Sequence, residues 1–219
     1  MKHRRNGPMP VEPAAQTIAR LVALGVSHET CARLESYVAL LAQWQSRINL
    51  ISPHTLPEVW SRHILDSAQL VLLRPDARRW VDLGSGGGLP GLVIGCMLAD
   101  LRDARVDLVE SNQKKAAFLR HAADALRLPV HVHAGRIEEV VATLPVPEVV
   151  TARALASLDQ LLGYANLLLK RGAIGLFPKG RDHMRELTEA HANWHFSHRL
   201  RDSITDDEAR IVEVVMTEA

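Results

Sequence analysis

The chain has 219 residues, of which 47% are hydrophobic, and its formal net charge is +1 at pH 7. A chain of this length can bury a substantial core without disulfides. The two cysteines, Cys31 and Cys96, lie far apart without a C-x-x-C spacing, which argues against a disulfide framework or a zinc site. No apolar run is long enough to span a membrane, and the first residues lack the apolar stretch of a signal peptide, so we expect a cytoplasmic protein without a membrane partner.

Charge is divided unevenly along the chain. Residues 1–79 hold 10 Lys and Arg against 6 Asp and Glu, whereas residues 80–219 hold 16 against 19. A basic N-terminal part is compatible with a phosphate-rich partner, and so small an imbalance is equally compatible with ordinary surface charge.

Residues 13–77 are predicted to form a helical lobe, preceded by a basic flexible arm over residues 1–12. Residues 14–24 can form a short helix that ends at Gly25, and Ser27 is a suitable N-cap for a second helix. In that second helix apolar residues recur at spacings of three and four, which predicts an amphipathic face.

A further helix is predicted from the capping box Thr55-x-x-Glu58. One side of it carries His63 and Asp66, which are neighbours at i, i+3 and could form a polar patch toward a cleft. The alternative is a solvated helix face with an Arg62–Asp66 ion pair.

The segment over residues 80–95, WVDLGSGGGLPGLVIG, indicates a binding site for an adenosine-type cofactor. A buried strand, a glycine turn and a helix start form such a site at the edge of an α/β sheet. Gly86-x-Gly88-x-x-Gly91 also satisfies the dinucleotide fingerprint, so the glycines alone do not separate NAD from other cofactors. Asp82 stands where NAD fingerprints normally have an apolar residue. An acid there can order the glycine loop and balance a sulfonium charge, which favours S-adenosylmethionine.

Strands and helices alternate beyond this segment, which predicts a mostly parallel sheet with helices on both faces. The predicted strands cover residues 105–109, 130–134, 148–151 and 173–177, followed by two more over 196–200 and 211–216. The last two form a hairpin in which one strand runs against the others. A seven-stranded sheet with such an edge is typical of the Rossmann-like class I methyltransferases, so the segment over residues 78–219 is predicted to be a methyltransferase domain.

Glu110 follows the second predicted strand, where a carboxylate can accept hydrogen bonds from both ribose hydroxyls of adenosine. NAD enzymes use the same arrangement, and the alternative is a solvated carboxylate that caps the helix from Asn112. His131 and His133 share one face of a strand, but no third ligand is evident, so no metal is expected.

The segments WQSRINLIS, HILDS, DLGSGGGLPG, ESNQKKAAFL, GRIEE, ARALASL and FPKG, in this order, resemble the ribosomal RNA small subunit methyltransferase G family (RsmG, also called GidB) over about residues 35–180. The resemblance implies transfer of a methyl group from S-adenosylmethionine to N7 of one guanine in the 530-loop of 16S rRNA. It implies cofactor contacts at Gly84, Leu89, Ile137, Glu138 and Arg153, and the residue patterns add Asp82, Gly86 and Glu110. Glu110 departs from the family, in which Asp is usual.

Guanine N7 already carries a lone pair, so the implied reaction needs no general base and no catalytic residue is assigned. His63, Asp66 and Lys179 are candidates to line the pocket for the target base, and Arg153 could also meet phosphate or base. The expected partner is 16S rRNA or the 30S subunit, and the protein is expected to be a monomer. Two other interpretations remain, an NAD-dependent oxidoreductase and a non-catalytic RNA-binding module of the same fold.

Overall fold

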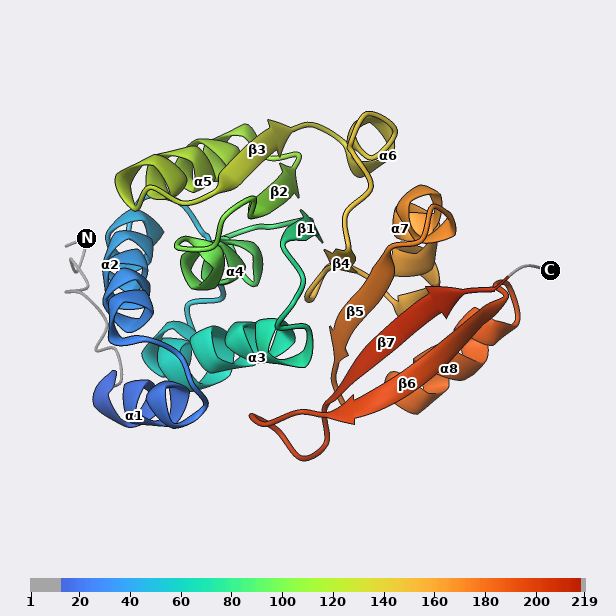
Figure 1. Cartoon of the computed structure of the whole chain (residues 1–219), viewed down its shortest axis with the longest axis horizontal. Helices are drawn as coiled ribbons and strands as arrows, with labels where there is room; N and C mark the ends of the chain where they lie inside the picture. Colours follow the sequence, from blue (N-terminus) through green and yellow to red (C-terminus); the bar gives the residue numbers. More distant parts are fainter. Residues whose placement is uncertain (1–12, 218–219) are drawn as a thin grey trace, which may run out of the picture.

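A seven-stranded sheet runs through the computed structural model, which describes residues 13–217 (Figure 1). The predicted arm over residues 1–12 lies outside the described residues. The strands are β1 (Arg79–Leu83), β2 (Arg105–Glu110), β3 (Val130–Ala134), β4 (Val149–Thr151), β5 (Ile174–Lys179), β6 (Phe196–Asp202) and β7 (Arg210–Met216). Their order in the sheet is β3-β2-β1-β4-β5-β7-β6, and every neighbouring pair is parallel except those that involve β7.

The predicted architecture is therefore confirmed, including the hairpin at one edge. Because parallel strands end at the same edge of a sheet, the loop after β1, Glu110 at the end of β2 and the segment after β4 are brought together. The strand order reverses beside β1, since β2 and β4 flank it on opposite sides.

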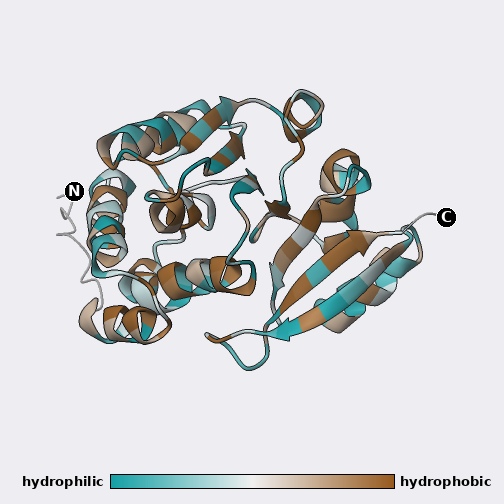
Figure 2. Ribbon diagram, viewed as in Figure 1, coloured by the Kyte–Doolittle hydropathy of each residue, from teal (hydrophilic) through white to brown (hydrophobic). Residues whose placement is uncertain are grey.

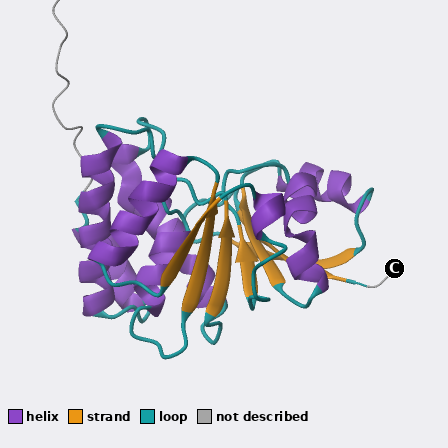
Figure 3. Cartoon of the chain, turned by 90° about the horizontal axis from the view of Figure 1, so that it is seen from above, coloured by secondary structure: helices purple, strands orange, loops and turns teal. Residues whose placement is uncertain are grey.

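Helices cover both faces of the sheet (Figure 3). One core lies against α1 (Ala15–Ala23), α2 (His28–Gln45), α3 (Asp66–Leu73), α4 (Gly91–Leu98) and α5 (Gln113–Ala125), and the other lies against α6 (Ile137–Val140), α7 (Leu158–Lys170) and α8 (His183–His191). The fully buried Trp80 belongs to the first core and Phe177 to the second. Figure 2 shows α4 mostly in brown, and all of its residues except Met97 are buried, as expected of a helix enclosed by the core. None of the helices over residues 13–217 is both long and apolar enough to cross a membrane.

The N-terminal helices share the first core with the sheet and do not form a core of their own. Leu34 and Leu41 of α2 are fully buried in it together with Trp80 and Phe118. The buried hydroxyl of Tyr37, also on α2, donates a hydrogen bond to the carbonyl oxygen of Gly87 at 2.7 Å. The helical lobe is therefore in direct contact with the glycine loop.

The start of the second helix is as predicted, because the side chain of Ser27 accepts a hydrogen bond from the Thr30 amide. The predicted capping box at Thr55 is wrong, since its side chain makes no cap hydrogen bond. The chain instead forms a short 3-10 helix (Leu56–Glu58) and a π-helix (Val59–Leu65), which continues into α3. The Thr55 hydroxyl is engaged elsewhere, since it contacts the Ser52 carbonyl and the ring of His63.

Candidate active site

A cavity of about 1100 Å³ opens at the carboxyl edge of the parallel strands. Its wall comes from the π-helix, the loops after β1, β2, β3 and β4, the end of β5 and the turn between β6 and β7. The wall contains His63, Asp66, Gly84, Gly86, Leu89, Glu110, Ile137, Glu138, Arg153 and Lys179, so the structure brings together every predicted site residue except Asp82.

The glycine loop is held at the cavity by Glu110. Gly84 and Gly86 have φ values of +70° and +55°, a backbone region that favours glycine. The Glu110 carboxylate accepts hydrogen bonds from the Gly86 amide at 2.8 Å and from the Asn112 amide at 2.7 Å. Glu110 is 8% exposed, so the alternative of a solvated carboxylate is wrong, although it does bind the amide at the start of α5.

Asp82 lies behind the glycine loop and is not part of the cavity wall. It is 1% exposed, and one of its oxygens accepts a hydrogen bond from the Gly91 amide at 3.1 Å. A Cβ atom at Gly91 would lie 2.6 Å from that oxygen, so only glycine fits beside it. Burial raises the pKa of Asp82 to about 7. The structure thus gives Asp82 a contact that orders the loop, and its predicted balancing of a cofactor charge stays a prediction.

His63 is buried in the π-helix, at 8% exposure, and forms part of the cavity wall. Its Nε2 lies 2.8 Å from the Thr55 hydroxyl oxygen, whereas its Nδ1 is buried and has no hydrogen-bond partner among residues 13–217. Burial and the nearby charges of Arg153 and Arg62 lower the pKa of His63 to about 3. The ring is therefore neutral at physiological pH.

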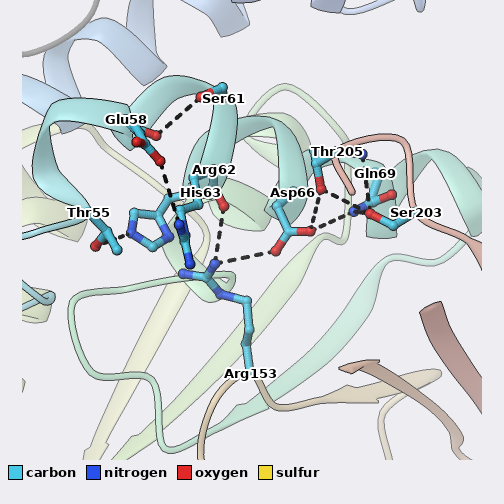
Figure 4. A network of polar contacts seen from close by, with 10 residues as sticks. All are labelled: Thr55, Glu58, Ser61, Arg62, His63, Asp66, Gln69, Arg153, Ser203 and Thr205. Atoms are coloured by element: carbon cyan, nitrogen blue, oxygen red, sulfur yellow. Dashed lines mark hydrogen bonds and ion pairs between the residues drawn. The ribbon is translucent and has the colours of Figure 1, made fainter. Parts of the chain in front are cut away.

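Asp66 belongs to a polar network that joins three distant parts of the chain (Figure 4). One carboxylate oxygen lies 3.3 Å from a guanidinium nitrogen of Arg153, and the other accepts hydrogen bonds from Thr205 at 3.1 Å and Gln69 at 2.8 Å. The alternative of an Arg62–Asp66 pair is wrong, because Arg62 pairs with Glu58 at 3.5 Å.

The turn between β6 and β7 contributes to the cavity, which sequence reasoning missed. Thr205 and Asp206 line the wall, and the amide of Ile204 donates a hydrogen bond to Gln69 at 2.9 Å. No local sequence pattern predicts this contact, since Ile204 and Gln69 lie more than one hundred residues apart in the chain. Tyr164 of α7 and Arg136 also line the cavity and were missed.

Lys179 lies at the end of β5 and is 8% exposed. Its ammonium donates a hydrogen bond to the Ala156 carbonyl at 2.7 Å and pairs with Glu186 at 2.8 Å. Glu186 in turn accepts a hydrogen bond from the Leu158 amide at the start of α7. The charge of Lys179 is thus engaged within the cavity wall. Within the part of the chain that the structure describes, no three His, Cys, Asp or Glu side chains gather as a metal site requires.

Asp82 and His63 are expected to make opposite contributions to stability as the pH changes. The pKa of Asp82 rises from 3.8 to about 7 on folding, so its contribution is lost progressively as the pH rises from 3.8 to about 7. The pKa of His63 falls from 6.5 to about 3, so its contribution is lost as the pH drops below 6.5. Each contribution changes by at most about 1.4 kcal/mol per pH unit.

Single variants separate the two contributions in urea denaturation between pH 4.5 and 6.5. On acidification, Asp82→Asn is expected to lose stability relative to the wild type, because the contribution of His63 is then unopposed. His63→Gln is expected to gain stability relative to the wild type over the same range. Parallel pH profiles for the three proteins would contradict both pKa shifts.

A family model described as GidB, rRNA small subunit methyltransferase G, matches residues 30–212. The chain belongs to this family. A relative from Methylorubrum extorquens strain PA1, named ribosomal RNA small subunit methyltransferase G, is 52% identical over 189 residues, which cover 86% of this chain and 90% of the relative. A relative of the same name from Rhodopseudomonas palustris strain BisB18 is 49% identical over 216 residues, which cover 96% of this chain and 90% of the relative.

Solved structures show the same fold as this member of the methyltransferase G family. Cofactor-bound Rv0187 from MTB has a TM-score of 0.61 and 14% identity, and the alignment covers 99% of this chain and 100% of that one. The O-methyltransferase TomG from Streptomyces achromogenes, in complex with SAM, has a TM-score of 0.59 and 14% identity. The alignment covers 93% of this chain and 96% of TomG. Family membership sets aside the interpretation as an NAD-dependent oxidoreductase.

Proposed function

We propose that this protein transfers a methyl group from S-adenosylmethionine to N7 of one guanine in the 530-loop of 16S rRNA, free or within the 30S subunit, in the cytoplasm. The observation that carries the proposal is the cavity, in which a glycine loop anchored by Glu110 meets polar groups from the π-helix, β5 and the hairpin turn. It supports the proposal because the chain belongs to a family named for methylation of small-subunit rRNA.

The cavity wall fits S-adenosylmethionine in the chemistry of its donor set. Gly84 and Gly86 present backbone without side chains, and the Glu110 carboxylate beside them has lone pairs to spare for ribose hydroxyls. Ile137 offers an apolar side chain, as an adenine ring requires. Arg153 has a buried Nε without a hydrogen-bond partner in the described chain, and a guanidinium suits the carboxylate of the methionine part. Leu89 and Glu138 complete the proposed cofactor set.

When bound, S-adenosylmethionine supplies a methyl group activated by a sulfonium. The protein contributes alignment, which can lower a barrier by about 7–11 kcal/mol when two reactants are held in place. Asp66 is a half-buried carboxylate of the wall, and negative charge there favours the positive charge that develops on a methylated guanine. His63 is neutral, so it adds no opposing charge. We assign Lys179 to the wall of the base pocket, where it holds the Ala156 carbonyl and Glu186.

The proposal is tested by incubating the protein with labelled S-adenosylmethionine and either free 16S rRNA or 30S particles that lack the modification. We expect one 7-methylguanosine, located in the 530-loop by mass mapping of nuclease fragments, with one of the two substrates. Binding of the RNA without methyl transfer would favour the non-catalytic RNA-binding interpretation. A methyl group on another nucleotide would contradict the assigned target.

A further inference from the structure

The hydrogen bonds around Thr55 determine which ring nitrogen of His63 carries its proton. A threonine hydroxyl has one proton to donate, and the Thr55 hydroxyl lies 3.0 Å from the Ser52 carbonyl, which can only accept. The same oxygen lies 2.8 Å from Nε2 of His63. Both contacts are hydrogen bonds only if Nε2 carries the proton. In a neutral imidazole this leaves Nδ1 with a lone pair and no proton.

That lone pair has no partner among the described residues, although the side chain is more than nine-tenths buried. A buried polar atom without a hydrogen bond is unfavourable and calls for an explanation at a functional site. His63 is held there by a π-helix, a rare conformation that is frequent at functional sites. His63 forms part of the cavity wall, so a ligand that offers an N–H group would satisfy Nδ1 once a shift of the ring exposes this covered atom to the cavity.

We propose that His63 is a specificity-determining residue whose Nδ1 accepts a hydrogen bond from the N1–H or 2-amino group of the target guanine. This inference rests on the proposed function. Guanine presents these two donors side by side, whereas adenine has an acceptor at N1 and no amino group at C2. An acceptor on the protein therefore favours guanine. Contact at this edge leaves N7, on the opposite side of the purine, free for methylation.

The surroundings of His63 favour a neutral donor over the ammonium group of S-adenosylmethionine. The positive charges of Arg62 and Arg153 both act on the ring, and Arg153 contacts the Arg62 carbonyl at 3.4 Å (Figure 4). Like charges repel more strongly in a partly buried site than in water, so an ammonium group is disfavoured beside these two arginines. A base N–H carries no net charge and suits the site.

Two substitutions separate the roles of the two ring nitrogens. The amide of His63→Asn lies near the position of Nδ1 and can keep an acceptor there, but it does not reach Thr55. The amide of His63→Gln lies near Nε2 and can keep the Thr55 contact, but it leaves no acceptor at Nδ1. The assay measures kcat/KM with the RNA substrate that the wild type methylates, and calorimetry measures the affinity of each protein for S-adenosylmethionine.

We expect His63→Gln to lower kcat/KM by roughly 10- to 100-fold, since a donor on the base is left unpaired. His63→Asn is expected to keep more activity than His63→Gln, and all three proteins are expected to bind S-adenosylmethionine equally. If His63→Gln were as active as His63→Asn or more active, only the Thr55 contact would matter, and this result would overturn the inference. A loss of cofactor affinity in His63→Gln would also overturn it, because Nδ1 would then contact the cofactor.

A measurement on the wild type keeps the inference testable if a variant does not fold. Nitrogen NMR of the histidine rings is expected to show His63 with its proton on Nε2, and addition of the substrate RNA is expected to shift its Nδ1 resonance. A proton on Nδ1 would overturn the inference even if methylation is observed. Absence of methyl transfer by the wild type to any small-subunit RNA would instead refute the proposed function, and the inference with it.

Discussion

Substitution of Gly84 by aspartate is expected to lower the affinity for S-adenosylmethionine by at least about 100-fold, equivalent to roughly 2.7 kcal/mol. Gly84 lines the cavity with a φ of +70°, and an added Cβ would lie 2.7 Å from a methyl group of Leu155. The side chain and its negative charge would occupy the space proposed for the cofactor. Aspartate tolerates the left-handed region better than most residues, so we expect the variant to fold. Isothermal titration calorimetry measures the affinity.

Gly172→Asp is the matched control for this substitution. Gly172 follows α7 with a φ of +100°, and a Cβ there would meet no atom within 4 Å. The control therefore introduces the same side chain at another left-handed glycine outside the cavity wall. We expect it to lose some stability and to keep wild-type cofactor affinity. Equal affinity of Gly84→Asp and the wild type would place the cofactor elsewhere.

Substitution of Lys179 by methionine is expected to lower the free energy of unfolding by about 3–5 kcal/mol, as for other buried ion pairs that lose one partner. The side chains of Lys179 and Glu186 are 7% and 17% exposed, so Glu186 would remain as a poorly solvated charge. The Ala156 carbonyl would lose its hydrogen bond as well. Urea denaturation followed by circular dichroism measures the change.

Arg185→Met provides the control on α8, the helix that carries Glu186. Arg185 pairs with Glu189 at 2.9 Å, but these side chains are 65% and 50% exposed. Solvent screens such a pair, so we expect a change below about 0.5 kcal/mol. Similar losses in the two variants would mean that burial does not strengthen the Lys179–Glu186 pair.

The sequence was sufficient to predict the sheet, because most strands are short apolar runs or alternate apolar and polar residues, and turn residues separate them from the next helix. Glu110 and Gly84 were placed at the cavity for the same reason, since Glu110 ends β2 and Gly84 directly follows β1. Local patterns carry this information, and parallel pairing then brings the strand ends together.

The π-helix and the hairpin contact could not be predicted in this way. Thr55-x-x-Glu58 has the residue types of a capping box, but the tertiary contact with His63 engages the threonine. The Thr205–Asp66 hydrogen bond depends on how the β6–β7 turn folds back on α3, which no spacing in the sequence encodes. Lys179 was predicted to line the cavity, but its pairing with Glu186 depends on the position of α8.

The hydrogen bond from Tyr37 to the Gly87 carbonyl has a consequence for exchange of parts between relatives. The fully buried Tyr37 belongs to α2 and Gly87 to the glycine loop, so two segments fifty residues apart must be inherited as a matched pair. A chimera that takes its first helices from one relative and its loop from another would have to preserve this contact and the shared core around it. The N-terminal helices therefore cannot be exchanged between relatives independently of the glycine loop, whose geometry limits where two sequences can be joined.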